Sequence, residues 1–408
     1  MAKPIDIDVL IYGGGVAGLW TLTRLQREGY SCVLVESKAL GSGQTIASQG
    51  IIHGGIKYAL TGEAGAASKA IAAMPEIWRE CLAGTGEIDL RNVKVLSEKQ
   101  NLWTTPGIGS RLAGVAASKV IRTAVRGVPK DSRIAPFDVA PRGVDVYEVE
   151  EPVLEPRSVV AALAGAAGAP ILATDSGPEG LGGGDVGLVI ENGVVRERIE
   201  FRPRRYVLAA GAGNGKLVSG FGYTSIGDEP PYARPQYRPL HMVMVRGDLP
   251  LVYGHCVGMS DKPRMTITSQ KDAAGRTVWY VGGSIAESGV GLSPDLQVRA
   301  ARREVAECVP WISLDGTQWS SFLIDRAEGS FGDAGNQRPD GPFVHACDDI
   351  ILTWPTKLAF APLLAERVVE SLRSQDILPT SVDLSAIVAL PRPPIAALPW
   401  DNEGMSWT

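Results

Sequence analysis

Near its amino terminus the chain has a glycine pattern of the kind that binds the pyrophosphate of a dinucleotide. The turn Gly13–Gly18 follows a short apolar run and precedes a helical pattern over Leu19–Glu28. Gly13 allows the tight bend, Gly15 lets the backbone approach the phosphates, and Gly18 lets helix and strand pack closely. The pyrophosphate would lie at the helix N-terminus, where free N–H groups and the helix dipole favour negative charge.

An acidic residue at the end of the next strand supports this interpretation. The apolar run Cys32–Val35 ends at Glu36, 18 residues after Gly18. A carboxylate in this place accepts hydrogen bonds from an adenosine ribose and would repel a 2′-phosphate. The alternative is a glycine-rich turn that binds nothing, which the acid disfavours. We expect cofactor contacts also from Val16, Ala17 and Ser37.

The first half of the chain alternates strand and helix patterns, as an α/β domain does. The Gly- and Ser-rich segment Gly41–Gly50 is expected to be a loop, and short β-like runs over 120–149 indicate a second sheet. A buried strand from Arg205 runs into a second glycine turn, Ala209–Asn214. The other expected elements are a helix at Ala64–Ala83, a strand at Val93–Ser97, a helix at Glu155–Ala167, a strand at Ile171–Thr174 and a hairpin at Val186–Glu200.

The second half has patterns typical of an antiparallel sheet followed by a return to the first domain. Three alternating runs, His241–Val245, Met265–Thr268 and Thr277–Val281, are expected to be strands, with a helix over them at Leu296–Val309. A strand at Ile350–Thr353 and a helix at Leu358–Leu372 come next. The tail from Pro391 is rich in proline, so we expect it to be extended or poorly ordered.

Composition excludes several classes of protein. The 408 residues carry a net charge of −5, with 45% hydrophobic and 21% charged residues, as in an ordinary globular protein. Without a basic cluster there is no electrostatic reason to expect nucleic acid. We find no signal peptide and no apolar run long enough to span a bilayer, so a cytoplasmic protein, at most peripheral to the inner membrane, is expected. Five scattered cysteines without C-x-x-C spacing indicate no metal site.

Three separated segments occur in an order that is informative as a set. They are residues 13–36, the segment Ser48–Tyr58 with His53-Gly54-Gly55 at its centre, and Pro355–Ala359 followed by Ala365-Glu366. Together they resemble the D-amino-acid oxidase superfamily of FAD enzymes. In motif they are closest to its glycerol-3-phosphate dehydrogenase and L-2-hydroxyglutarate dehydrogenase branches.

The resemblance implies an α/β fold, α+β overall, in which a Rossmann-like FAD-binding domain is interleaved with a mixed or antiparallel-sheet substrate domain. Residues 1–95, 150–235 and 325–390 would form the FAD-binding domain. Residues 96–149 and 236–324 would form the substrate domain, and 391–408 would be a proline-rich tail. The cofactor contacts that it implies, besides those of the first glycine turn, are Thr45, Ser48, Gln49, Gly50, Ile52, Ala210, Gly211, Thr356, Lys357 and Leu358.

Two positively charged or titratable residues would lie beside the flavin ring. Lys357, at the start of the last helix, would stabilise negative charge on the reduced flavin, with N–H groups from Thr356 and Leu358. His53 would contact the flavin or act as general base. The alternatives are a solvated lysine and a loop histidine bonded to backbone carbonyls.

Further candidates lie in the substrate domain. Arg326 and Arg338 could bind a carboxylate or phosphate, although the motif around them departs from that of the glycerol-phosphate branch. An internal salt bridge with Asp325 or Glu328 is the alternative for Arg326. His241 could be the base or a satisfied core histidine. Tyr58 and Tyr253 are the first aromatic candidates for the pocket, and His255 and His345 have weaker claims.

The resemblance, together with these candidate residues, implies an FAD-dependent dehydrogenase or oxidase that transfers hydride from a C–H bond of a small anionic substrate to flavin N5. The substrate would be a 2-hydroxy acid or resemble a polyol phosphate, with His53 or His241 as base, and the electron acceptor would be oxygen or a quinone. Oxidation of an amine or amino acid is the first alternative. A non-catalytic flavin-binding or redox-sensing protein is the second.

Overall fold

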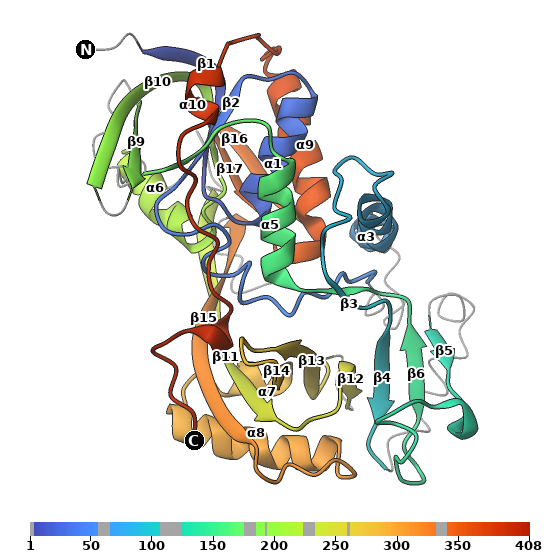
Figure 1. The fold of residues 1–408 in the computed structure, drawn as a ribbon. Helices are drawn as coiled ribbons and strands as arrows, with labels where there is room; N and C mark the ends of the chain where they lie inside the picture. Colours follow the sequence, from blue (N-terminus) through green and yellow to red (C-terminus); the bar gives the residue numbers. More distant parts are fainter. Residues whose placement is uncertain are drawn as a thin grey trace.

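The computed structural model describes residues 4–55, 66–106, 125–174, 185–191, 194–222, 233–258, 262–331 and 341–408. Within these ranges the chain forms two lobes, each built on one large sheet (Figure 1). The first lobe contains the N-terminus, and the chain ends against the second lobe. In the part of the chain described, no helix combines the length and apolarity needed to cross a membrane.

A seven-stranded sheet forms the centre of the first lobe. Its strand order is β16-β17-β10-β1-β2-β8, with β9 paired to β10. The five strands β8, β2, β1, β10 and β17 run parallel, so their carboxyl ends meet at one edge of the sheet. The bounds are β1 Ile5–Tyr12, β2 Cys32–Glu36, β8 Ile171–Ala173, β9 Asp185–Glu191, β10 Val194–Leu208, β16 Phe343–Cys347 and β17 Ile350–Trp354.

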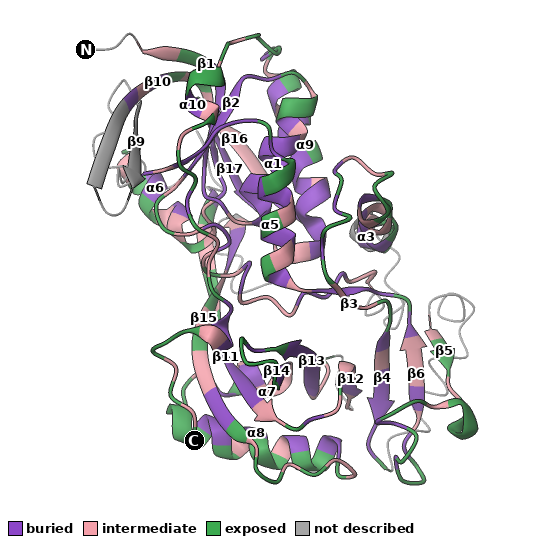
Figure 2. Cartoon of the chain, in the orientation of Figure 1, coloured by how far each residue is buried: buried purple, intermediate pink, exposed green. Residues whose placement is uncertain are grey.

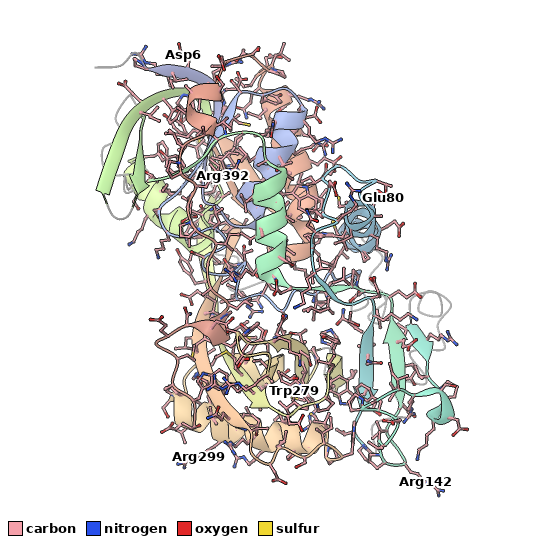
Figure 3. The ribbon with its side chains drawn as sticks, in the orientation of Figure 1. Asp6, Glu80, Arg142, Trp279, Arg299 and Arg392 are labelled. Carbon is pink, nitrogen blue, oxygen red and sulfur yellow. The ribbon has the colours of Figure 1, made fainter. Side chains whose placement is uncertain are left out.

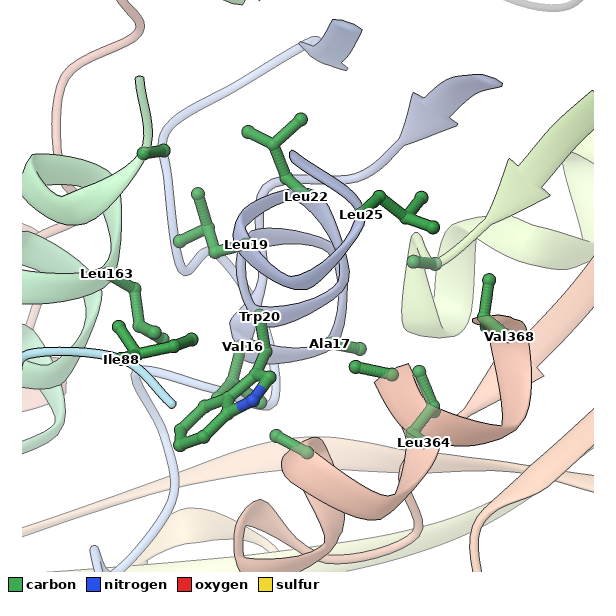
Figure 4. Close-up of a cluster of buried hydrophobic side chains, with 14 of the residues drawn as sticks. Val16, Ala17, Leu19, Trp20, Leu22, Leu25, Ile88, Leu163, Leu364 and Val368 are labelled. Carbon is green, nitrogen blue, oxygen red and sulfur yellow. The ribbon is translucent and has the colours of Figure 1, made fainter. Parts of the chain in front are cut away.

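Three helices cover one face of this sheet: α1 Val16–Arg27, α5 Pro156–Ala166 and α9 Ala361–Ser374. Between them lies a core of aliphatic residues with Trp20 (Figure 4). The Trp20 ring packs on Trp78 of α3 (Ala66–Ala83), with ring centroids 4.7 Å apart. The other face of the sheet is covered by a smaller core that includes α6 (Asn214–Gly220) and α10 (Ser385–Val388).

The second lobe is an eight-stranded sheet with α8 (Pro294–Cys308) packed on one face. Figure 2 shows α8 buried toward the sheet and exposed outside, while Figure 3 shows Trp279 inside this lobe and Arg299 at its outer rim. The strand order is β15-β11-β14-β13-β12-β4-β6-β5. The bounds are β4 Gln100–Thr104, β5 Val125–Gly127, β6 Val146–Val149, β11 Ala233–Gly247, β12 Tyr253–Val257, β13 Met265–Lys271, β14 Thr277–Gly282 and β15 Gln318–Phe331.

The remaining short elements lie in the segments that connect the longer helices and strands. Strand β3 (Val95–Ser97) pairs with β7 (Val153–Leu154), and α7 (Ser284–Ser288) precedes α8. The 3-10 turns are η1 Lys130–Ser132, η2 Gly211–Gly213, η3 Leu358–Phe360 and η4 Pro399–Asp401.

Two long strands cross the expected domain boundaries. Strand β11 begins at Ala233 and β15 continues to Phe331, so the expected boundaries at 235 and 324 fall inside strands. The two strands pair over their whole common length, from Ala233 with Phe331 to Arg246 with Gln318. Only the later part of β11, from Val243, also pairs with β14. Prolines 235 and 239 are tolerated because they lie in the part of β11 that pairs with β15 alone. A residue of such an edge segment can lack an N–H without removing a hydrogen bond from the sheet.

The final helical segment is divided in two. We expected one helix from Leu358, but a 3-10 turn over Leu358–Phe360 precedes α9, which begins at Ala361 with a proline in its first turn. Proline is well suited to that position because the N–H it lacks has no partner within the helix. The other long helices, and most of the strands expected in both sheets, are confirmed to within about three residues at each end. Two strands are longer than expected: β10 joins the second strand of the expected hairpin to the run from Arg205, and β11 begins at Ala233, ahead of the expected His241.

The proline-rich tail is extended, as expected, but it is packed against both lobes. Ile395 bridges to Leu40 of the first lobe. Trp400 is buried and donates its Nε1–H to the Lys271 carbonyl in the second lobe. At the chain end, the N–H and C=O of Thr408 pair with those of Trp319 in β15. Of the two expected alternatives, extended or poorly ordered, the structure shows the first, because the apolar residues between the prolines supply enough buried surface to hold the tail.

Candidate functional site

The first glycine turn lies at the carboxyl edge of the parallel sheet, between β1 and α1. Gly13 has φ of +108°, and a Cβ there would lie 2.6 Å from the Cα of Ala210. A Cβ on Gly18 would lie 1.9 Å from the Gly13 carbonyl oxygen. The turn can close only without side chains at these positions, as the sequence predicted.

The N-terminus of α1 has no acidic residue in its first turn and no side-chain cap from Gly15. The Val16 N–H is bonded to the Thr45 hydroxyl, at 3.1 Å, which brings the loop after β2 to this helix end. Val16 and Ala17 are buried. A helix end of this kind favours an anion through its dipole and its N–H groups.

Glu36 lies beside the turn at the end of β2. Its Oε2 accepts the Gly14 N–H at 2.7 Å, and its Oε1 accepts the Lys38 N–H at 2.8 Å. The carboxylate is only half-buried, so it keeps oxygen lone pairs for hydroxyl donors. Ser37 is exposed next to it.

The loop expected to contact the flavin passes between the two lobes. A Cβ on Gly50 would lie 1.8 Å from the Leu154 carbonyl oxygen, and Ile52 is fully buried. Gln49 donates its amide to the Tyr280 carbonyl of β14 at 2.9 Å. The Ser48 Oγ is buried without a hydrogen-bond partner among the residues that the structure describes.

The second glycine turn packs against the first and against the segment that contains Lys357. The Ala210 N–H donates to the Asn214 Oδ1, and Trp354 donates its Nε1–H to the Gly211 carbonyl at 3.0 Å. Thr356 adopts φ of +60°, which is uncommon for a residue with a Cβ and indicates local constraint. Lys357 is half-buried and precedes the turn that begins at Leu358.

His53, in the loop between the lobes, faces a buried carboxylate that the sequence did not identify. Its Nδ1 lies 3.5 Å from the Oε2 of Glu151, and the side chains are 37% and 6% exposed respectively. The Oε1 of Glu151 accepts the Gly54 N–H at 2.5 Å, and Oε2 accepts the Gln100 amide at 3.0 Å. The ring of His255 stacks on that of His53, with centroids 5.8 Å apart and planes inclined by 22°.

Burial and hydrogen bonding set the charge states of this group. Burial by itself raises the pKa of Glu151, but the bonds from His53 and the Gly54 N–H outweigh it and lower the pKa below its usual range. Burial lowers the pKa of His255 to about 4, with the charge of His53 contributing in the same direction. At neutral pH Glu151 is therefore ionised and His255 is uncharged.

His241 does not belong to this group. It is 1% exposed within β11, with Nδ1 2.9 Å from the Gly289 carbonyl oxygen and Nε2 3.0 Å from the Ser321 hydroxyl. Because a carbonyl only accepts, Nδ1 carries the proton and Nε2 accepts from Ser321. Both nitrogens are engaged and the ring is buried, which favours the satisfied core histidine over a base or substrate donor.

Arg326 is tied into an internal network on β15. It donates to the Arg238 carbonyl and forms an ion pair with Glu287 at 3.2 Å. We had considered Asp325 and Glu328 as its partners, but in the described part of the chain Glu328 is paired with Arg238 instead. A strand places successive side chains on opposite faces, so Asp325 points away from Arg326.

Of the aromatic candidates and the second arginine, the structure describes Tyr253 but not Tyr58 or Arg338. Tyr253 is half-buried on β12 opposite Thr268 of β13, and burial raises the pKa of its hydroxyl. Directly paired residues share one face of a sheet, so Tyr253 and Thr268 lie on the same face as His255 and its partner Thr266. Tyr58 and Arg338 lie outside the described residues.

Sequence reasoning missed Glu151 and underrated His255. Glu151 lies two residues after β6 and belongs to no recognisable motif. Its position beside His53 results only from the path of the chain back to the first lobe. The one available signal was the acidic pair 150–151 just before a proline, which does not distinguish a buried from an exposed acid. His255 became a neighbour of His53 only because β12 pairs with β13 next to the loop.

The residues present fit an FAD molecule. The glycines let the turns at the carboxyl edge of the sheet close tightly, and the N-terminus of α1 and Glu36 suit a pyrophosphate and a ribose. The buried, unpartnered Ser48 Oγ, in the described part of the loop, is the kind of atom that a bound ligand satisfies.

Comparison with known proteins agrees with this fit. The sequence model of the family described as FAD dependent oxidoreductase (DAO) matches residues 8–332. The probable FAD-dependent oxidoreductase PA4991 of Pseudomonas aeruginosa is 42% identical over 405 residues, which cover 98% of this chain and 99% of that protein. The crystal structure of PA4991 superposes with a TM-score of 0.78, at 38% identity and the same coverage.

More distant structures share the fold alone. Glycine oxidase from Geobacillus kaustophilus has a TM-score of 0.58 at 17% identity, covering 95% of this chain and 99% of that one. L-alpha-glycerophosphate oxidase from Mycoplasma pneumoniae, solved with FAD bound, has a TM-score of 0.59 at 16% identity, covering 90% and 95%.

Proposed function

Because this chain belongs to the FAD-dependent oxidoreductase (DAO) family, we propose that it oxidises a C–H bond of a small anionic substrate bearing a hydroxyl group, with His53 as the proton acceptor. A 2-hydroxy acid or a polyol-phosphate-like compound fits this description. The observation that carries the proposal is the half-exposed imidazole of His53 backed by the buried, ionised Glu151.

The residues at the carboxyl edge of the first sheet would hold FAD. The turn Gly13–Gly18 and the N-terminus of α1 would receive the pyrophosphate, Glu36 the ribose, and the loop around Ser48 and Gln49 the ring system. Bound FAD supplies an acceptor for the hydride that leaves the substrate carbon.

The protein's own task is to bind the substrate and take up its proton. The Nε2 of His53 has no hydrogen-bond partner among the described residues, so it is available to a hydroxyl. Lys357 begins a helical segment without an acid in the first turn of η3 or α9, and would favour negative charge there. These features support an anionic substrate in front of His53 and Lys357.

Oxidation of an amine or amino acid is the second candidate. The ionised carboxylate of Glu151 behind His53 would attract a protonated amine as well as support proton transfer from a hydroxyl. A protonated amine must lose its proton before oxidation, and His53 could accept it.

Anaerobic reduction of the bound flavin distinguishes these candidates. We expect loss of absorbance near 450 nm with one or more 2-hydroxy acids or glycerol phosphate, and slower or no loss with amino acids of the same size. The variant His53→Asn should slow this reduction by about 100- to 10,000-fold, the usual contribution of a general base. Reduction by amino acids alone would favour the second candidate. Reduction by dithionite but by no substrate would favour a non-catalytic flavoprotein.

The electron acceptor is tested with the reduced enzyme. We propose oxygen or a quinone. Mixing the reduced enzyme with air-saturated buffer or with a soluble quinone, and following the return of the 450 nm band, shows which of them reoxidises the flavin within the turnover time.

A further inference from the structure

Glu151 occupies an unusual position for an acid. It lies at the junction where the chain leaves β6 and returns to the first lobe, and its side chain is 6% exposed. Three groups approach its two oxygens: the Gly54 N–H and the Gln100 amide, which both donate, and Nδ1 of His53 at 3.5 Å. Such a buried carboxylate is costly unless it is bonded in this way.

The carboxylate determines which nitrogen of His53 carries a proton. An ionised carboxylate only accepts hydrogen bonds, so the Nδ1 that faces it must be the N–H of the ring. In the uncharged ring Nε2 is then the nitrogen with the free lone pair. A base needs this arrangement, because the nitrogen that faces the substrate must be the unprotonated one.

The other neighbours of His53 do not provide a competing charge. His255 stacks on the ring, donates to or accepts from the Thr266 hydroxyl at 2.8 Å, and is uncharged at neutral pH. On the adjacent helix α3, Glu76 and Arg79 are paired with each other at 3.0 Å. Among the described residues, Glu151 is thus the ionised group in contact with the His53 ring.

We propose that Glu151 is a positioning residue that holds His53 in the Nδ1–H tautomer and so presents Nε2 to the substrate. The inference rests on the proposed function of His53 as base. In the step it serves, the substrate O–H bond breaks, its proton passes to Nε2 and the electron pair stays on the oxygen. His53 then carries one positive charge, which the carboxylate of Glu151 stabilises.

The substitution Glu151→Gln gives a specific prediction for the tautomer. The Gly54 N–H requires an acceptor at the Oε1 position, so the new amide should place its oxygen there and its NH2 group toward His53. The unpartnered Oε1 of the buried Gln100 can turn to accept from the same NH2 group. Nδ1 of His53 must then accept, and the ring proton moves to Nε2.

The tautomer can be read directly by NMR of the FAD-loaded protein with 15N-labelled histidine. The chain has four histidines, so the long-range proton–nitrogen spectrum is simple enough to assign with single variants. We expect Nδ1–H for His53 in the wild type and Nε2–H in Glu151→Gln. We also expect Nδ1–H in Glu151→Asp, which keeps the carboxylate.

The rate of flavin reduction provides the second measurement. Glu151→Gln should lower the rate constant at saturating substrate by about 100- to 10,000-fold, with little change in substrate affinity. Glu151→Asp should recover part of this loss. The matched control is Glu150→Gln, the same chemical change at the exposed neighbouring residue, which should leave tautomer and rate as in the wild type.

Several outcomes would overturn the inference. One is an Nε2–H tautomer in the wild type, which can be established even if Glu151→Gln does not fold. Another is an unchanged tautomer in Glu151→Gln, and a third is a changed tautomer with an unchanged rate. Because the NMR measurement needs no substrate, a swapped tautomer in a protein that no substrate reduces would reject the proposed function while supporting the role of Glu151 toward His53.

Discussion

The carboxyl edge of the first sheet and the inner face of the second sheet contribute differently to the candidate site. The edge contributes mainly backbone at glycines, and the inner face, which carries His255 and Thr268, contributes side chains. At the edge, the critical positions are glycines whose Cβ atoms would overlap backbone, at 1.9 Å for Gly18 and 1.8 Å for Gly50. On the inner face, the critical groups are side chains from separate strands, such as His255 of β12 and Thr266 and Thr268 of β13. The geometry of the edge therefore depends on positions without side chains, whereas the chemistry of the face depends on which side chains are present.

This difference explains how each region can change. A backbone site tolerates almost no substitution at its glycines, because the overlap is with main-chain atoms that cannot move aside. A face of alternating side chains can exchange one polar group for another while the sheet stays intact. We infer that the cofactor end is fixed and that the substrate end is where related proteins can differ.

The largest effect is expected from Gly18→Ala. Its Cβ would overlap the Gly13 carbonyl oxygen, so the turn must open, bound FAD should be lost, and the free energy of unfolding should fall by about 3 kcal/mol. The ratio of 450 to 280 nm absorbance and urea unfolding measure the two effects. Gly165→Ala is the control, because Gly165 lies in α5 with no atom near its Cβ and should gain up to about 1 kcal/mol. Retention of FAD by Gly18→Ala would contradict the inference that the glycine positions at the edge cannot accept a side chain.

Asp8→Asn tests whether side-chain networks also support the edge. Buried Asp8 accepts hydrogen bonds from Ser31, Thr380 and Arg204. Burial raises its pKa, but the bonds from Thr380 and Ser31 outweigh burial and lower the pKa. Because the pKa of Asp8 is lower in the folded state, this carboxylate stabilises the protein at pH values above its unfolded-state pKa of about 3.9. The stabilisation is lost as the pH falls through the folded-state pKa. The variant should lose about 2 kcal/mol at pH 7 and show a flatter acid dependence in urea unfolding.

The control for this pH experiment lies on the same strand. Asp6 is exposed, so Asp6→Asn should change stability by less than about 0.5 kcal/mol at any pH. If Asp8→Asn kept the acid dependence of the wild type, the network around Asp8 would not be its source.

His241→Asn should separate structural from functional histidines. The shorter amide cannot reach both the Gly289 carbonyl and the Ser321 hydroxyl, so we expect a loss of about 1 to 2 kcal/mol in stability. FAD content and the rate of flavin reduction should stay within about twofold of the wild type. His53→Asn should show the reverse pattern, slow reduction with little loss of stability. A slow His241→Asn enzyme with normal stability would contradict the structural assignment.

Thr268→Val is expected to have the smallest effect on stability and the opposite sign. The Thr268 Oγ1 is buried without a hydrogen-bond partner in the described part of the chain, so valine should raise stability by about 1 kcal/mol. If the hydroxyl is kept for a ligand, the KM for substrate should rise at the same time. Thr353→Val is the control, because its hydroxyl donates to the Leu208 carbonyl and its loss should cost about 1 kcal/mol. An unchanged KM would remove Thr268 from the substrate face.

Local patterns were sufficient for much of the fold. The strands of the first sheet, the glycine turns and α1, α5 and α8 follow from hydrophobic periodicity, glycine spacing and capping residues, which are readable within a few neighbouring positions. The strand β15 was not expected, since its mixed polar sequence shows strand structure only through its long pairing with β11. The tail was judged by its prolines, whereas Trp400 and Ile395 anchor it by contacts far away in sequence.

The cofactor end of this protein could be predicted from the order of its amino acids, because glycines that a tight turn requires occur at a fixed local spacing. The reacting end depends on the tertiary structure. That structure assigned His241 to the core and Arg326 to an ion pair with Glu287, and it brought Glu151 and His255 to His53. The physical reason is that the protonation and availability of a side chain depend on the groups packed around it, and strand pairing brings those groups together from distant parts of the chain.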